Sequence, residues 1–149
     1  LRIIQNADLK FSTLFSVKPH IFVSRTNPLA DRLSVTLDEL KNYPRLTFEQ
    51  GTNNSFYYAE EPHITEESPK SIIVTDRATL FNLIIGLNGY TISSGILSSD
   101  LNGTDIIAIP LESNEVMEIG YICQTDRPLG NLSIRYLEHL KNYITAYKI

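Results

Sequence analysis

Two short polar segments, residues 51–55 and 75–79, combine residue types that suit the binding of a small anion. Their sequences are Gly-Thr-Asn-Asn-Ser and Thr-Asp-Arg-Ala-Thr, and each follows a strand-like apolar stretch and precedes a helical pattern. The first turn of a helix presents unpaired backbone N–H groups and roughly half a positive charge. Hydroxyl and amide side chains there complete a site for a carboxylate, sulfate or phosphate group. The segments therefore predict a small-molecule binder, and they do not by themselves indicate catalysis.

The same side chains have a simpler interpretation as helix caps. Residues able to accept a hydrogen bond from a first-turn amide occur in both segments: Thr52, Asn53, Asp76 and Thr79. Arg77 could bind an anion, but an exposed arginine could equally pair with Asp76 or Glu49. The sequence alone leaves capping and ligand binding open.

Catalytic and metal-binding patterns are not found in the sequence. His20 begins a strand-like run, His63 lies in an acidic stretch and His139 lies in the last helical pattern. None of them has a metal-ligand spacing to another histidine or to Cys123. There is no Gly-x-Ser-x-Gly elbow, P-loop or Gly-x-Gly-x-x-Gly motif, and the Ser-Ser-Gly at 93–95 lacks the strand-to-helix context of an elbow. We therefore expect no catalytic residue, no metal and no cofactor.

Length and composition limit the classes of protein to consider. The 149 residues suffice for one domain, or for one lobe with part of another. A net charge of −4 argues against a free-standing nucleic-acid binder, although a longer protein could carry a DNA-binding segment elsewhere. A single cysteine, Cys123, forbids an internal disulfide, and no apolar run reaches the ~20 residues that a membrane span needs. The first residue is Leu1, so the chain could start inside a longer protein, or at an engineered or proteolysed boundary.

Strand and helix patterns alternate along the chain. Strands are expected at residues 19–24, 45–49, 72–74, 90–93, 106–109 and 116–123, after an extended segment at 11–15. Helices are expected at residues 37–43, 56–61, from about 75 to the glycine turn at 86–89, and 132–147, with the end of another at 1–7. Thr36 and Glu39 have the spacing of a capping box. This alternation predicts a mostly parallel, doubly wound α/β sheet, which binds ligands at the carboxyl ends of its strands.

Several segments, in their order and spacing, are similar to those of one known family. Phe-Val-Ser at 22–24 followed by Asn-Pro-Leu-Ala at 27–30 resembles that family's strand and His-Pro-Leu-Ala turn, with Asn27 in place of the usual histidine. Further similar segments lie at residues 35–40, 44–48, 80–94, 109–111, 119–121 and 126–129, and in the last helix. The chain thus resembles the C-terminal effector-binding domain of LysR-type transcriptional regulators.

The resemblance implies a particular fold and division of the chain. It implies an α/β, periplasmic-binding-protein-like (type 2) domain of two lobes, with the effector in the cleft between them. Residues 18–111 would form a complete second lobe, and residues 1–17 and 117–149 would form part of the first lobe with the crossover strands. The family's first strand and helix, its winged helix-turn-helix and its linker helix have no counterpart in this sequence, so an N-terminal truncation is expected.

The resemblance also implies a function and a set of contacts. The chain would sense a small-molecule effector, anionic to judge from the helix starts, without catalysis and without contact with a membrane. It would be cytoplasmic and a homo-oligomer, and DNA would be bound only through a domain missing from this chain. The implied effector-binding residues are Gln50, Thr52, Asn53, Thr75, Asp76, Thr79, Tyr90 and Ser93. The alternatives are a solute-binding protein of a transporter and an enzyme on a related fold, for which no catalytic set can be assembled.

Overall fold

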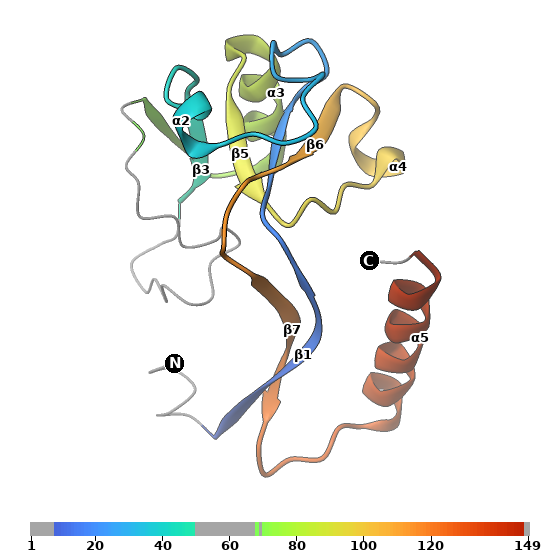
Figure 1. Cartoon of the computed structure of the whole chain (residues 1–149). Coiled ribbons are helices and arrows are strands. Elements are labelled where there is room, and N and C mark those ends of the chain that lie inside the picture. Colours follow the sequence, from blue (N-terminus) through green and yellow to red (C-terminus); the bar gives the residue numbers. More distant parts are fainter. Residues whose placement is uncertain (1–7, 50–67, 69, 148–149) are drawn as a thin grey trace. The chain divides into compact units, whose positions relative to one another are not determined.

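A computed structural model describes residues 8–49, 68 and 70–147 (Figure 1). The chain divides into two compact units: unit 1 comprises Leu1–Val17 and Glu118–Ile149, and unit 2 comprises Lys18–Met117. The helices expected at residues 1–7 and 56–61 lie outside the described residues. The division into a complete and a partial lobe stays a prediction.

Unit 2 is built on a five-stranded sheet with the strand order β4-β3-β5-β2-β6 (Figure 1). Its strands are β2 (His20–Ser24), β3 (Arg45–Phe48), β4 (Ser71–Val74), β5 (Tyr90–Ser93) and β6 (Ile106–Pro110). The strand β3 is parallel to β4 and β5, whereas β2 is antiparallel to both β5 and β6. All strands but β2 therefore share one direction, as a mostly parallel sheet requires.

The described residues of unit 2 include the helices α2 (Leu37–Leu40), α3 (Arg77–Leu87) and α4 (Ser99–Asn102). The predicted capping box is present at the start of α2, where Thr36 N donates to Glu39 Oε2 at 2.9 Å and Glu39 N donates to Thr36 Oγ1 at 3.4 Å. The helix ends three residues earlier than expected. Its last turn tightens, because Tyr43 N donates to Leu40 O, three residues back, just before the helix-breaking Pro44.

Side chains are buried on both faces of the sheet. Successive side chains of a strand point to opposite sides, so the same strands contribute to both buried clusters. The face toward α3 buries Phe22, Leu46, Val74, Leu80, Ile84 and Ile106. The other face buries Ile21, Val23, Leu29, Val35, Leu40, Tyr90, Ile92, Ile109 and Leu111. Within the part of the chain that the structure describes, no helix is long and apolar enough to cross a bilayer.

A tight turn joins α3 to β5 and sets where β5 begins. Asn88 caps α3 in the left-handed conformation, with φ of 51°, and Gly89 follows it. A Cβ atom on Gly89 would collide with Leu46 Cδ1 and lie 3.0 Å from the Pro44 carbonyl oxygen. The turn expected at residues 86–89 thus consists of Asn88 and Gly89, because Gly86 still belongs to α3, and Gly89 allows β5 to enter the sheet closely beside β3.

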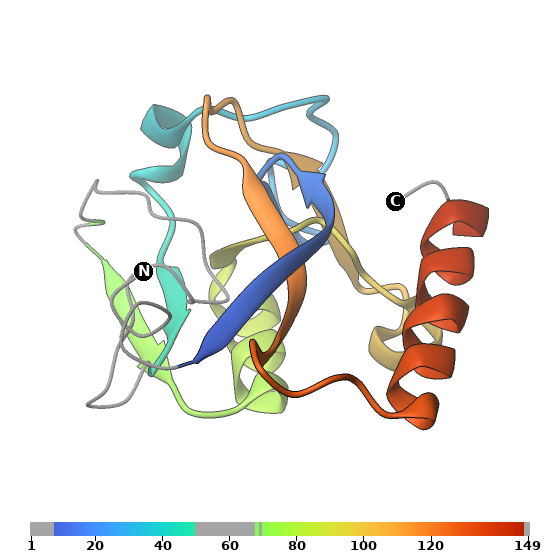
Figure 2. The same ribbon diagram turned by 90° about the horizontal axis from the view of Figure 1, so that it is seen from below.

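Unit 1 contains β1 (Leu9–Val17), β7 (Met117–Gln124) and α5 (Asn131–Tyr147). The strands β1 and β7 form a two-stranded sheet and lie side by side in both views (Figure 1, Figure 2). They run antiparallel, since Thr125 N donates to Asp8 O at 2.6 Å and Cys123 Sγ lies 3.8 Å from Lys10 O. The sequence pattern predicts an apolar stripe of Leu137, Leu140, Ile144 and Tyr147 along α5, and the first three of these residues are half-buried.

Candidate functional site

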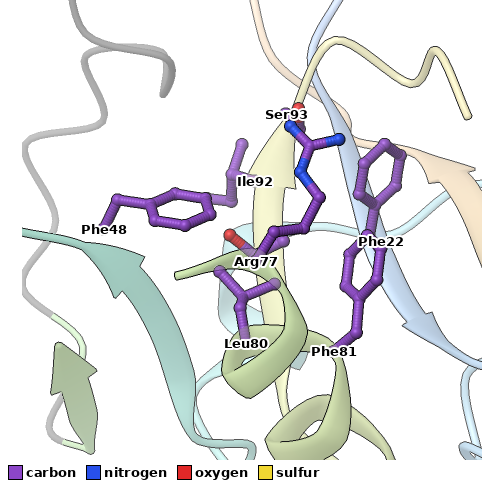
Figure 3. Close-up of a pocket in the computed structure, with 8 residues that line it drawn as sticks. Phe22, Phe48, Arg77, Leu80, Phe81, Ile92 and Ser93 are labelled. Atoms are coloured by element: carbon purple, nitrogen blue, oxygen red, sulfur yellow. The ribbon is translucent and has the colours of Figure 1, made fainter. Parts of the chain in front are cut away.

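A pocket lies in unit 2 where the carboxyl ends of β3 and β5 meet the start of α3 (Figure 3). It is a shallow, partly open hollow, and the figure of about 330 Å³ for its empty space includes open solvent. The residues that line it are Phe22, Phe48, Arg77, Leu80, Phe81, Thr91, Ile92 and Ser93. This is the sheet edge at which open α/β folds bind small molecules.

The wall of the pocket is largely aromatic and comes from three separate elements. Phe22 is on β2, on the sheet face that packs against α3, and only 6% of it is exposed. Phe48 is the last residue of β3, and Phe81 lies in the second turn of α3. Phe81 is four residues after Arg77, so the two side chains share one face of the helix. The apolar wall and the arginine are thereby directed to the same place.

The polar groups of the pocket lie on α3 and β5. Thr91 is buried and Ser93 is half-buried, and both point to the α3 face because they are two residues apart on one strand. Figure 3 shows the guanidinium group of Arg77 extending toward Ser93. Among the described residues that line the pocket, Arg77 is the charged one. One cation and two hydroxyl groups can bind a ligand with a single negative charge.

The start of α3 is closed by its own cap. Asp76 Oδ1 accepts a hydrogen bond from Thr79 N at 2.8 Å. The hydrogen bond from the Thr79 amide lowers the pKa of Asp76 below its ordinary value of 3.8. For Asp76 the capping interpretation is therefore correct. This cap occupies one of the first-turn amides and places a carboxylate at the start of α3. The guanidinium of Arg77 is therefore better suited to bind an anion than the helix terminus itself.

The predicted effector-binding residues have different positions in the structure. Ser93 lines the pocket, while Thr75, Asp76 and Thr79 are exposed around the start of α3. Tyr90 is 4% exposed and packs in the core on the other face of the sheet. Three further predicted residues, Gln50, Thr52 and Asn53, lie outside the described residues. The ligand role of every one of them stays a prediction.

Sequence reasoning did not single out the aromatic part of the pocket. Phe22, Phe48 and Phe81 are far apart in the chain and converge only in the folded sheet. The spacing of Arg77 and Phe81, four residues apart at the start of a helix, was the one local pattern that could have indicated them.

His20, another residue that could take part in chemistry, has its ring Nδ1 2.9 Å from the Lys18 carbonyl oxygen. Across residues 8–49, 68 and 70–147, no group of three or more histidine, cysteine, aspartate or glutamate side chains could hold a metal ion.

Comparison by sequence identifies no relative: no family model matches the chain, and no curated protein matches it. Comparison by structure does find similar proteins. The PA01 protein of Pseudomonas aeruginosa, described as a LysR-family transcriptional regulator, superposes with a TM-score of 0.69 at 10% identity, over 93% of this chain and 49% of that one.

Two effector-binding domains solved with a ligand are also similar. The domain of QuiR, in complex with shikimate, matches with a TM-score of 0.62 and 18% identity, over 91% of this chain and 65% of that chain. The domain of BenM, with its effector benzoate, matches with a TM-score of 0.64 and 16% identity, over 95% of this chain and 65% of that chain.

These likenesses establish the fold. The structure matches that of a LysR C-terminal effector-binding domain, which is α/β and periplasmic-binding-protein-like (type 2). The predicted fold class is confirmed. The chain spans between 49% and 65% of the length of these three structures.

Proposed function

We propose that this chain is the effector-sensing domain of a bacterial LysR-type transcriptional regulator and that a small molecule binds in the pocket of unit 2. The observation that carries the proposal is the position of the pocket at the carboxyl ends of β3 and β5, lined by one arginine and three phenylalanines. The fold supports it, because the similar domains of QuiR and BenM hold shikimate and benzoate, respectively.

The domain would act by binding alone, without a chemical reaction. A ligand shifts a conformational equilibrium by as much as its affinity differs between the two conformations. The shift would be transmitted to DNA through a domain outside this chain, in a cytoplasmic homo-oligomer. The alternative is a solute-binding protein of a transporter, which captures a ligand without an effect on transcription. No observation on this chain favours it.

Thermal unfolding of the whole chain in the presence of a panel of small metabolites tests this function. A ligand that binds only the folded chain stabilises it by about 2.7 kcal/mol at a concentration 100 times its Kd, so it raises Tm. We expect at least one anionic metabolite to do so. If no metabolite raises Tm, the sensing function is wrong.

A matched pair of serine variants tests whether the pocket is responsible. Ser93→Ala removes a hydroxyl group that lines the pocket. Its control, Ser98→Ala, removes an exposed hydroxyl that makes no capping hydrogen bond. A hydrogen bond to a charged group contributes about 1.5–3 kcal/mol, so Ser93→Ala should weaken binding about tenfold or more, and Ser98→Ala should not. Equal binding by both variants would place the ligand elsewhere.

A further inference from the structure

We infer that two copies of this chain associate through β4, with the outer edges of the two β4 strands paired antiparallel about a two-fold axis at Ile73. The partner at this edge is thus a second copy of the chain. The inference goes beyond the proposed function, because it requires no ligand. It supplies an interface for the homo-oligomer.

The strand β4 lies at one end of the five-stranded sheet, and its partner within unit 2 is β3. Among the described residues, no strand pairs with its other edge. Alternate carbonyl groups of this segment accept from β3 and the residue after it: Lys70 O from Arg45 N and Val74 O from Glu49 N, both at 2.8 Å. Backbone groups of successive residues point to opposite sides of a strand, so those of Ser71 and Ile73 point away from β3. The outer edge therefore offers donors and acceptors to another strand.

Ile73 gives this edge an exposed apolar side chain. The residue is 69% exposed, although isoleucine in a strand is usually covered. Ser71 and Thr75 lie two residues to either side, are exposed, and share its face. In an antiparallel pair centred on Ile73, the two isoleucines lie opposite each other and Ser71 of each copy lies opposite Thr75 of the other. Cross-strand contacts between apolar side chains and hydrogen bonds between hydroxyl side chains both stabilise such pairs.

The charges that flank β4 match those of a second copy in one direction and one register. Lys70 and Asp76 lie three residues before and three residues after Ile73. Antiparallel pairing about Ile73 places Lys70 of each copy opposite Asp76 of the other. Parallel pairing in register would place like charges side by side, which is unfavourable. A shift by two residues would place Lys70 opposite Val74, or Asp76 opposite Ile72. The segment is therefore complementary to itself, and this property carries the inference.

Both charged side chains have contacts within the chain that leave them able to make another. Lys70 Nζ donates to Asn42 O at 3.4 Å, and an ammonium group has three donors. Asp76 Oδ1 accepts from Thr79 N at 2.8 Å, and a carboxylate has about four acceptor sites. The hydrogen bond from the Thr79 amide also lowers the pKa of Asp76, so this carboxyl group is charged at neutral pH.

The contact between two such short strands is small. Stable protein interfaces bury about 1,200–2,000 Å² in total, which is more than two four-residue edges can supply. We therefore expect a weak dimer that forms and dissociates as the concentration changes.

Sedimentation equilibrium of the whole chain at concentrations up to about 1 mM measures this association. We expect a monomer–dimer equilibrium. Ile73→Lys places two like charges opposite each other at the two-fold axis and should weaken the dimer about tenfold or more. The control Leu33→Lys introduces the same charge at a loop residue that is 94% exposed, and it should leave the dimer unchanged. Both variants should keep the Tm of the unaltered chain, because each changes an exposed side chain.

Disulfide formation in the presence of oxidised glutathione tests the register. The background is Cys123→Ser, which removes the native thiol. Ile73→Cys should crosslink two copies, because directly opposite residues of a hydrogen-bonded antiparallel pair have Cα atoms about 5.5 Å apart, within disulfide range. Leu33→Cys, the control for random collision, should crosslink far less. A mixture of Ser71→Cys and Thr75→Cys chains should crosslink more than either variant alone.

Three results would overturn the inference. The unaltered chain could stay monomeric up to the highest concentration. Ile73→Lys could dimerise as tightly as Leu33→Lys, which would place the contact on another surface. Ile73→Cys could crosslink no more than Leu33→Cys, which would show that the two β4 edges do not meet. None of these results bears on the sensing function, which the rise of Tm with a ligand tests separately.

Discussion

Asn27 and Asn88, 61 residues apart in the chain, are joined by a hydrogen bond from Asn27 Nδ2 to the Asn88 carbonyl oxygen at 3.0 Å. Asn27 Oδ1 also accepts from Leu29 N at 2.9 Å, and only 4% of the Asn27 residue is exposed. The bond links the turn after β2 to the left-handed residue that ends α3. Because β2 carries Phe22 and α3 carries Arg77 and Phe81, this link holds together two of the elements that form the pocket.

Asn27→Ala should destabilise the chain by about 1–3 kcal/mol, because the Leu29 amide and the Asn88 carbonyl would lose their partner in a buried site. Urea unfolding measures the change. The exposed Asn114 offers a control, and Asn114→Ala should stay within about 0.5 kcal/mol of the unaltered chain. Equal stability of the two variants would show that the link contributes nothing.

Two glycines near the end of α3, Gly86 inside the helix and Gly89 just after it, should respond in opposite ways to alanine. Gly89→Ala places a methyl group against Leu46 Cδ1 and 3.0 Å from the Pro44 carbonyl oxygen, and it should destabilise by about 1–3 kcal/mol. Gly86 lies within α3, and a Cβ atom there meets nothing within 4 Å. Gly86→Ala should therefore stabilise by about 0.5–1 kcal/mol. A Gly89→Ala variant as stable as Gly86→Ala would show that β5 does not need the close approach to β3.

The cap of α3 should make stability depend on pH. The hydrogen bond from the Thr79 amide lowers the pKa of Asp76 in the folded chain below its ordinary value of 3.8. A carboxyl group with a lowered folded-state pKa stabilises the fold above its unfolded pKa, and this stability is lost as the pH falls through the folded pKa. Asp76→Ala should thus be less stable than the unaltered chain at pH 7, and the difference should narrow as the pH falls below 3.8.

The control for this pH experiment is Asp126→Ala, at the exposed turn after β7. We expect it to leave the free energy of unfolding nearly unchanged at pH 7. A difference between Asp76→Ala and the unaltered chain that stays constant from pH 7 to pH 2.5 would contradict the role of the charged cap.

Local patterns in the sequence were sufficient for much of the fold. The capping box of Thr36 and Glu39 depends on residues three apart, and the glycine turn before β5 lies within four consecutive residues. Such short-range interactions are decided by neighbouring residues, so they can be predicted without the rest of the chain. The end of α2 was harder to predict. The hydrogen bond from Tyr43 N to Leu40 O forms in place of one more turn of α-helix before Pro44.

The site depends on long-range packing, which the sequence did not disclose. Tyr90 and Ser93 both belong to β5, yet Tyr90 enters the core opposite α3 while Ser93 lines the pocket. Their faces follow from the register of β5 with β2, in which Tyr90 pairs with Val23 and Ser93 pairs with His20. Because Tyr90 and Ser93 are three residues apart on one strand, their side chains could have been predicted to point to opposite faces of the sheet. Which of the two faces holds the pocket is set by where α3 packs, and the spacing does not show that.

The position of the bound ligand can be measured directly by ¹H–¹⁵N NMR spectroscopy of the whole chain. The titrant is the metabolite that most raises Tm. We predict that the largest amide shifts occur at Arg77, Phe81, Thr91 and Ser93, with the amides of α5 unchanged. Shifts confined to α5 or to the β1–β7 pair, with the pocket amides unmoved, would show that this pocket is not where the chain senses a small molecule.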